Sequence, residues 1–144
     1  MTRIFHAIIM ILLLSATIAF SQDTRPTEPA QAATTSALAA EVQICTEITD
    51  RACTGGALAF DANVGKLYCW SQITGGSGEA IIKHIWSHAG KVVLEVPLTI
   101  KGNRWRTWSV KNIPANLTGE WEVKVVDASG NAIKSVTFTV GEKR

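Results

Sequence analysis

Regular alternation of apolar and polar residues, broken at short intervals by turn residues, constrains this chain more than any other feature. Across residues 92–100 the apolar positions are every second residue: Val92, Leu94, Val96, Leu98 and Ile100. Successive side chains of a strand point to opposite faces of a sheet, so this period of two predicts a half-buried β-strand. The domain contains no stretch with a sustained helical period, which excludes a helical fold.

Seven such stretches follow one another along the chain. The predicted strands are Val42–Ile48, Val64–Ile73, Glu79–His88, Val92–Ile100, Arg104–Lys111, Gly119–Asp127 and Ile133–Val140. Pro97 has no N–H to donate, which predicts an edge strand or a bulge at that position. Gly102-Asn103 predicts a two-residue hairpin between the fourth and fifth strands. Together the strands predict an all-β fold, an immunoglobulin-like antiparallel β-sandwich of about seven strands.

The N-terminal residues predict export. Arg3 supplies a positive charge, residues 7–20 are almost wholly apolar, and Ala19-Phe20-Ser21 forms a small-x-small cleavage site before Gln22. The apolar run of about 14 residues is shorter than the roughly 20 that span a bilayer. We therefore expect a signal peptide at residues 1–21 and no membrane span after its cleavage, with an uncleaved anchor as the alternative.

Composition divides the remainder into a linker and a domain. Residues 22–40 are rich in alanine, threonine, proline and serine, which predicts a flexible tether. Residues 41–144 suffice for one β-sandwich domain with a single core. Loss of Arg3 takes Lys+Arg from 14 to 13 against 12 Asp+Glu, so the mature net charge is about +1. This charge gives no reason to expect nucleic acid as a partner.

The three cysteines, Cys45, Cys53 and Cys69, predict one disulfide and one remaining thiol in an exported protein. Cys45 and Cys69 both lie on predicted strands, so we favour the Cys45–Cys69 pair, which would tie the first strand to the second. Cys45–Cys53 is the alternative. Because no Cys-x-x-Cys pair is present, we expect no metal site. We also expect no cofactor.

The segment Arg104-Trp105-Arg106-Thr107-Trp108-Ser109 holds two of the five tryptophans and two arginines. Alternation places Arg104, Arg106 and Trp108 on one face of the strand; we call these three residues the Arg/Trp row. Guanidinium groups bind carboxylates bidentately, and an indole offers a flat apolar surface, which suits a ligand surface. Guanidinium stacked on indole can instead brace a sheet. The brace is the more common role in a sandwich.

His84 and Trp86 are two residues apart and share a face of the third strand. If that face also carries the Arg/Trp row, His84 and Trp86 extend the candidate ligand surface. His84 alone is more typical of a hydrogen-bonded strand residue. A hydrolase would use His84 or His88 as its base, but Ser109 lies on a strand and not in a nucleophile elbow. We therefore expect no catalytic residues and no enzyme.

With these motifs the chain resembles the bacterial family called domain of unknown function 2914, from Cys45 to Val140. The resemblance rests on Gly65-Lys66-Leu67-Tyr68-Cys69-Trp70, His84-Ile85-Trp86, Arg104-Trp105-Arg106-Thr107-Trp108-Ser109, Gly119-Glu120-Trp121-Glu122-Val123 and Phe138-Thr139-Val140. The resemblance implies a location outside the cytoplasm. It also implies that the Arg/Trp row, His84, Trp86 and Trp121 are family-defining positions, without assigning them a role.

These observations predict an exported, periplasmic or extracellular module that is not catalytic and binds an envelope protein or glycan. A purely structural domain with an Arg/Trp brace is the alternative, and a hydrolase is the second alternative.

Overall fold

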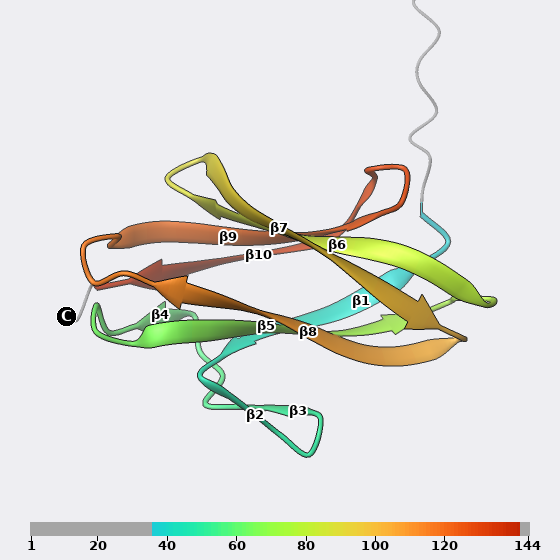
Figure 1. Cartoon of the computed structure of the whole chain (residues 1–144), viewed down its shortest axis with the longest axis horizontal. Helices are drawn as coiled ribbons and strands as arrows, with labels where there is room; N and C mark the ends of the chain where they lie inside the picture. The colour runs from blue at the N-terminus through green and yellow to red at the C-terminus, as the bar shows by residue number, and fades with distance from the viewer. Residues whose placement is uncertain (1–35, 142–144) are drawn as a thin grey trace, which may run out of the picture. The chain divides into compact units, whose positions relative to one another are not determined.

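The computed structural model describes residues 36–141, which form a sandwich of two β-sheets (Figure 1). The ten strands are β1 (Ala39–Cys45), β2 (Glu47–Thr49), β3 (Ala52–Thr54), β4 (Ala59–Phe60), β5 (Gly65–Thr74), β6 (Glu79–His88), β7 (Lys91–Lys101), β8 (Arg104–Ile113), β9 (Gly119–Asp127) and β10 (Ala132–Val140). One sheet has the order β1-β5-β8 and the other β4-β10-β9-β6-β7, while β2 and β3 form a separate hairpin. The predicted all-β antiparallel sandwich is confirmed.

The seven long strands correspond to the seven predicted from alternation, and β2, β3 and β4 are short additions between the first two of them. β4 pairs with β10 in the one parallel register among the described strands. β1 begins at Ala39, so the last two residues of the predicted linker lie in the sheet. The predicted signal peptide and residues 22–35 of the linker lie outside the described residues.

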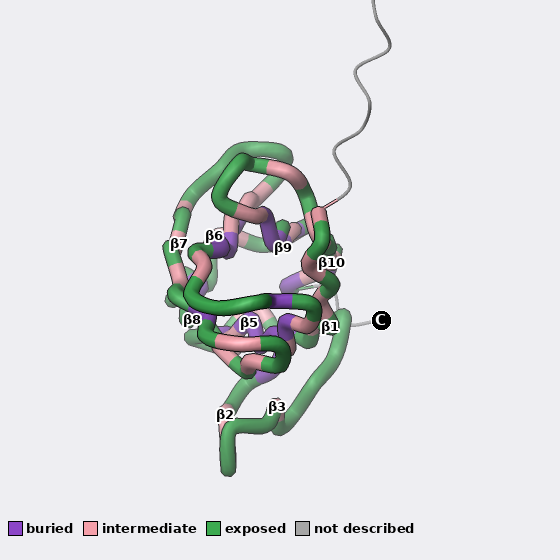
Figure 2. Tube along the Cα trace, turned by 90° about the vertical axis from the view of Figure 1, so that its right-hand side faces the viewer, coloured by how far each residue is buried: buried purple, intermediate pink, exposed green. Residues whose placement is uncertain are grey.

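The core lies between the two sheets, where buried residues of both layers meet (Figure 2). At its centre Trp121 stacks on Phe138 with 6.3 Å between ring centroids, and Trp86 meets Phe138 edge-on. Around these rings lie aliphatic side chains from both sheets, including Ile44 and Leu67. Burial of these large apolar side chains is the main force that holds the two sheets together.

The strand that contains Pro97 is an edge strand, as predicted: β7 is the last strand of its sheet and pairs only with β6 among the described strands. The prediction that Val92 faces the same side as Leu94 and Ile100 was wrong, because the Val92 side chain is 59% exposed. Trp86 pairs with Leu94, but the next residue, Ser87, pairs with Val92. The extra residue, Val93, is a bulge that ends the alternation established further along β7.

The predicted hairpin at Gly102-Asn103 is also wrong, because β7 and β8 belong to different sheets. This turn carries the chain across the sandwich, next to the crossing between β5 and β6. The Gly102 amide donates to the Gly78 carbonyl at 2.9 Å, and the Gly75 amide donates to the Asn103 carbonyl at 3.1 Å. A Cβ at Gly76 would lie 2.5 Å from the Gly102 carbonyl oxygen, so the close approach of the two crossings requires glycine.

Candidate functional site

The Arg/Trp row lies on the outer face of the three-stranded sheet. Along β8 the exposed residues are Arg104, Arg106 and Trp108, and they alternate with the half-buried Trp105 and Thr107 and the buried Ser109. The predicted division of this segment between two faces is therefore confirmed. Trp108 is 36% exposed, whereas the other four tryptophans of the chain are buried or half-buried. The row forms part of the molecular surface.

Gln72 of β5 organises the two arginines. It lies directly opposite Arg106 in the β5–β8 register, two residue pairs away from Arg104 and on the same face of the sheet. Its side-chain oxygen Oε1 accepts hydrogen bonds from Arg104 Nε at 3.1 Å and from Arg106 Nε at 3.3 Å. Among the described residues no arginine stacks on a tryptophan ring. Because only the Nε groups are used, the terminal nitrogens of both guanidinium groups stay available to a ligand.

The β2–β3 hairpin extends from this same outer face, on the side away from the five-stranded sheet (Figures 1 and 2). The Trp70 indole of β5 donates its Nε1–H to the Arg51 carbonyl at 2.9 Å, which ties the hairpin tip to the sheet. A disulfide between Cys45 at the end of β1 and Cys53 of β3 ties it a second time. The hairpin is thus attached to the face that carries the Arg/Trp row.

This disulfide corrects the predicted Cys45–Cys69 pair. In the β1–β5 register Cys69 lies opposite Ile44, and Cys45 lies opposite Tyr68. Neighbours opposite each other share a face, so Cys45 and Cys69 point to opposite faces of the sheet and their sulfur atoms cannot meet. Cys69 is the free cysteine, and burial in the core raises the pKa of its thiol. Such a thiol is unreactive at neutral pH.

Arg51 joins Arg104 and Arg106 at a surface hollow of about 430 Å³. The residues that line it are Arg51, Arg104, Trp105 and Arg106; we call it the arginine hollow. Sequence reasoning did not single out Arg51, because it lies far along the chain from the Arg/Trp row. One sequence feature pointed to it: Arg51, Arg104 and Arg106 are the only arginines within residues 36–141.

His84 and Trp86 were predicted as possible ligand-binding residues, and the structure places them elsewhere. Both side chains are 0% exposed and lie between the sheets, so neither can share a surface with the Arg/Trp row. The reason is that β6 belongs to the five-stranded sheet, and the face of β6 that carries His84 and Trp86 is turned toward the three-stranded sheet. The prediction that His84 is a hydrogen-bonded strand residue is confirmed.

The His84 ring bridges the two sheets through serine hydroxyls. Nε2 lies 2.9 Å from Ser71 Oγ, and Nδ1 lies 2.8 Å from Ser109 Oγ. The Trp86 indole also donates to Ser109 Oγ, at 3.0 Å. Burial lowers the pKa of His84 to about 4, so the ring is neutral at physiological pH. A neutral ring needs one donor and one acceptor, and the two hydroxyls supply them.

His88, the other histidine considered as a base, donates from Nε2 to the Thr118 carbonyl at 2.8 Å and packs on the Trp121 ring. Within residues 36–141 no group of three or more histidine, cysteine or acidic side chains is arranged to hold a metal ion. The same residues contain no helix long and apolar enough to cross a membrane.

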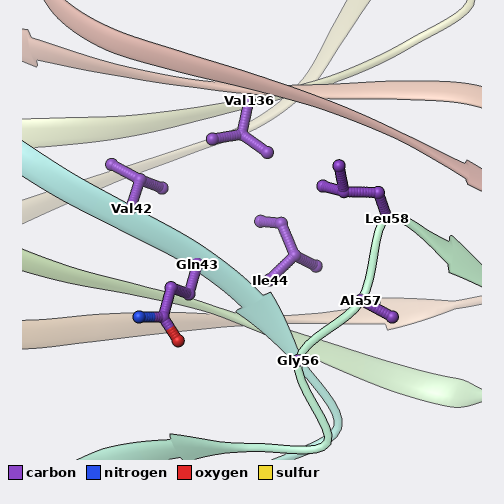
Figure 3. A pocket seen from close by; sticks show the side chains of 7 residues that line it. All are labelled: Val42, Gln43, Ile44, Gly56, Ala57, Leu58 and Val136. Atoms are coloured by element: carbon purple, nitrogen blue, oxygen red, sulfur yellow. The ribbon is translucent and has the colours of Figure 1, made fainter.

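A second hollow, of about 300 Å³, lies where β1 approaches β10 and has an apolar lining (Figure 3). Val42, Ile44, Leu58 and Val136 point toward a common space in this view, and Gln43 turns its amide away. Leu58 is 63% exposed at its rim. Because no polar groups converge here, this hollow lacks the features that fix a ligand's orientation.

Comparison with known proteins finds a family model that matches part of the chain. Residues 79–140 match the family described as "Protein of unknown function (DUF2914)". This confirms the resemblance predicted from sequence, over β6 to β10. The matched residues contain the whole Arg/Trp row, while Arg51 and the β2–β3 hairpin precede them. No curated protein matches the chain.

Among solved structures, the chain is similar to a β-glucosidase from Listeria innocua, solved in complex with glucose, with a TM-score of 0.42 and 10% sequence identity. The alignment covers 73% of this chain and 16% of that chain. A likeness of this extent carries no argument about function.

Proposed function

We propose that this protein is an exported module, periplasmic or extracellular, that is not catalytic and binds a protein or glycan partner of the cell envelope. The binding surface is the outer face of the three-stranded sheet. The observation that carries the proposal is the Arg/Trp row itself: two arginines held in place by Gln72 stand exposed beside Trp108, the most exposed tryptophan.

The charges of the row support binding in preference to bracing. Within residues 36–141 all ion pairs are made by lysines: Lys83–Glu95, Lys101–Glu79 and Lys124–Glu122. Arg104 and Arg106 have a neutral amide as their partner and keep their charge uncompensated. Exposed guanidinium groups beside an exposed indole are typical of recognition surfaces, where arginine and tryptophan contribute most of the binding energy.

The N-terminal sequence and the disulfide support export. A charged start, an apolar run and a small-x-small site before Gln22 are typical of a signal peptide. Disulfides persist in oxidising compartments outside the cytoplasm, and Cys45–Cys53 is consistent with such an address. A linker rich in alanine, threonine and proline would let a small domain reach partners near the membrane.

Retention on isolated envelope fractions tests the binding role. The full chain should be retained on the fraction that holds its partner, and Arg106→Ala and Trp108→Ala should each lose most of that retention. Lys134→Ala is the matched control, because Lys134 is exposed on β10 in the other sheet. All variants should keep the wild-type melting temperature to within a few degrees. Equal retention of all variants, or none for the wild type, would refute the proposal.

Mass analysis of the protein recovered from its host tests export. We expect a mature chain that begins at Gln22 and is recovered outside the cytoplasm. A chain found in the cytoplasm with residues 1–21 intact would contradict export.

A further inference from the structure

The arginine hollow adds a third positive charge, that of Arg51, to the two arginines of the Arg/Trp row. Within residues 36–141, three arginines line one hollow while seven lysines are distributed over other parts of the domain. No described arginine takes part in an ion pair. The nearest acidic residue in the sheet register, Glu41, lies opposite Gln72 and accepts a hydrogen bond from Gln43 at 2.9 Å. Three guanidinium groups that share one space repel each other unless an anion lies between them.

Arg51 is held at the hollow by a strained turn. Asp50 and Arg51 connect β2 and β3 as a two-residue loop, with φ of 52° and 60°. Both values lie in the left-handed region, where glycine or asparagine is normally found in such turns. Asp50, the acidic neighbour of Arg51 in this turn, does not line the hollow, so all three charged residues of its lining are arginines. A bulky arginine at a position that favours glycine indicates a role for its side chain.

Two attachments position the backbone of Arg51. The Trp70 indole holds the Arg51 carbonyl, and the Cys45–Cys53 disulfide fixes the strand that follows the turn. On the opposite wall Gln72 holds Arg104 and Arg106 through their Nε groups. The backbone of Arg51 and the Nε groups of Arg104 and Arg106 are therefore held in place before a ligand binds, which lowers the conformational entropy lost on binding.

We propose that the arginine hollow binds the carboxylate groups of an acidic glycan, a sugar chain that carries uronic acids. The proposal rests on the binding role given above and names its ligand class. A planar carboxylate matches the fork of a guanidinium group, so three arginines can hold two neighbouring carboxylates of one chain. Trp108 continues the row beyond Arg106 and offers an exposed indole face to the C–H surface of a sugar ring.

The location of the hollow favours a glycan over an acidic peptide. Extended peptides gain much of their affinity from backbone hydrogen bonds at a free strand edge. β8 is the last strand of its sheet, but its unpaired backbone groups point sideways in the plane of the sheet, whereas the side chains of the row stand out from the sheet face. A ligand in the hollow therefore meets side chains. Carboxylates and hydroxyls of a sugar chain find donors there, and an apolar surface lies beside them.

Binding of an oligogalacturonate to the full chain, measured by calorimetry, tests the proposal. The free-acid oligosaccharide should bind, and its methyl ester, which has the same sugar chain without the charge, should bind about tenfold or more weakly. Arg51→Gly should lower affinity for the free acid by a similar factor. Because glycine suits the left-handed φ of this position, the variant should be at least as stable as the wild type. A purely structural Arg51 would give unchanged affinity.

Lys134→Gln is the control with the same change in net charge, and its affinity should equal that of the wild type. Arg51→Lys should recover only part of the affinity, because an ammonium group lacks the bidentate fork. Reduction of the disulfide in the wild type should weaken binding to the level of Arg51→Gly, since it releases the hairpin. Binding that survives reduction unchanged would refute the role of the hairpin.

Three other outcomes would overturn the glycan assignment: equal binding of the free acid and its ester, no binding of either, or tighter binding of a polyglutamate peptide of the same length. The envelope-retention experiment separates this failure from failure of the binding role. If retention still depends on Arg106 and Trp108, the module binds a partner of another chemistry and only the ligand class is wrong.

Discussion

The two faces of β8 each contain a tryptophan and polar residues, and they have opposite roles. The inward face holds Ser109, which accepts hydrogen bonds in the core, and the outward face holds Arg104, Arg106 and Trp108. Inside, every buried polar side-chain atom of residues 36–141 has a partner, because an unsatisfied group between the sheets costs about 1–3 kcal/mol. Outside, guanidinium terminal nitrogens remain without one. Side chains suited to binding therefore lie where water, or a ligand, can replace a missing hydrogen-bond partner.

The sharpest test of this difference is to truncate one tryptophan of the core, Trp86 of β6, and the outward tryptophan of β8, Trp108. Trp86→Ala should lower the free energy of unfolding by about 3–5 kcal/mol, because Trp86 is 0% exposed and contacts Phe138. Trp108→Ala should cost at most about 1 kcal/mol, because Trp108 lies on the solvent side of the sheet. Urea denaturation measures both values. A loss of several kcal/mol for Trp108→Ala would show that the row is a brace.

The buried His84 predicts a pH dependence of folding. Its pKa is about 4 in the folded chain and about 6.5 in the unfolded chain. The unfolded state therefore binds more protons between these values, so the stabilising contribution is complete above pH 6.5 and is lost as pH falls toward 4. The expected loss is about 3 kcal/mol. His84→Gln should remove this part of the slope in denaturation series from pH 7 to 4, and an unchanged slope would contradict the prediction.

The smallest effect is expected for the outward arginines. Arg104→Ala and Arg106→Ala each remove one exposed hydrogen bond to Gln72, so each should change the unfolding free energy by no more than about 0.5 kcal/mol. Thermal melting measures the change. Ser109→Ala is the inward comparison, and it should cost more stability because two buried groups, His84 Nδ1 and Trp86 Nε1, lose their hydrogen-bond partner. A drop of many degrees for either arginine variant would favour the brace.

Much of this fold could be predicted from local patterns. Alternation located seven strands, Pro97 identified an edge strand, and the two faces of β8 were assigned correctly. The failures concern pairing. Gly102-Asn103 has the residues of a hairpin turn, but a turn reverses the chain whether or not the next strand stays in the same sheet. The bulge at Val93 likewise depends on β6, its partner strand.

The site shows the same limit. The alternation of His84 and Trp86 shows that they share a face, but it does not show whether that face meets a ligand or the core. The position of β6 in the other sheet places both residues in the core. The Cys45–Cys53 bond depended on which face of β1 Cys45 occupies. Arg51 gained its place beside Arg104 and Arg106 through the hairpin that this bond holds.

The sequence by itself determined the strands, their alternating faces and the all-β class, because side-chain direction in a strand follows from the position along the chain. The tertiary structure alone decided which strands share a sheet, which cysteines pair, and that three arginines from distant segments line one hollow. These outcomes depend on contacts between remote residues, and the free energy of such contacts comes from packing the whole core.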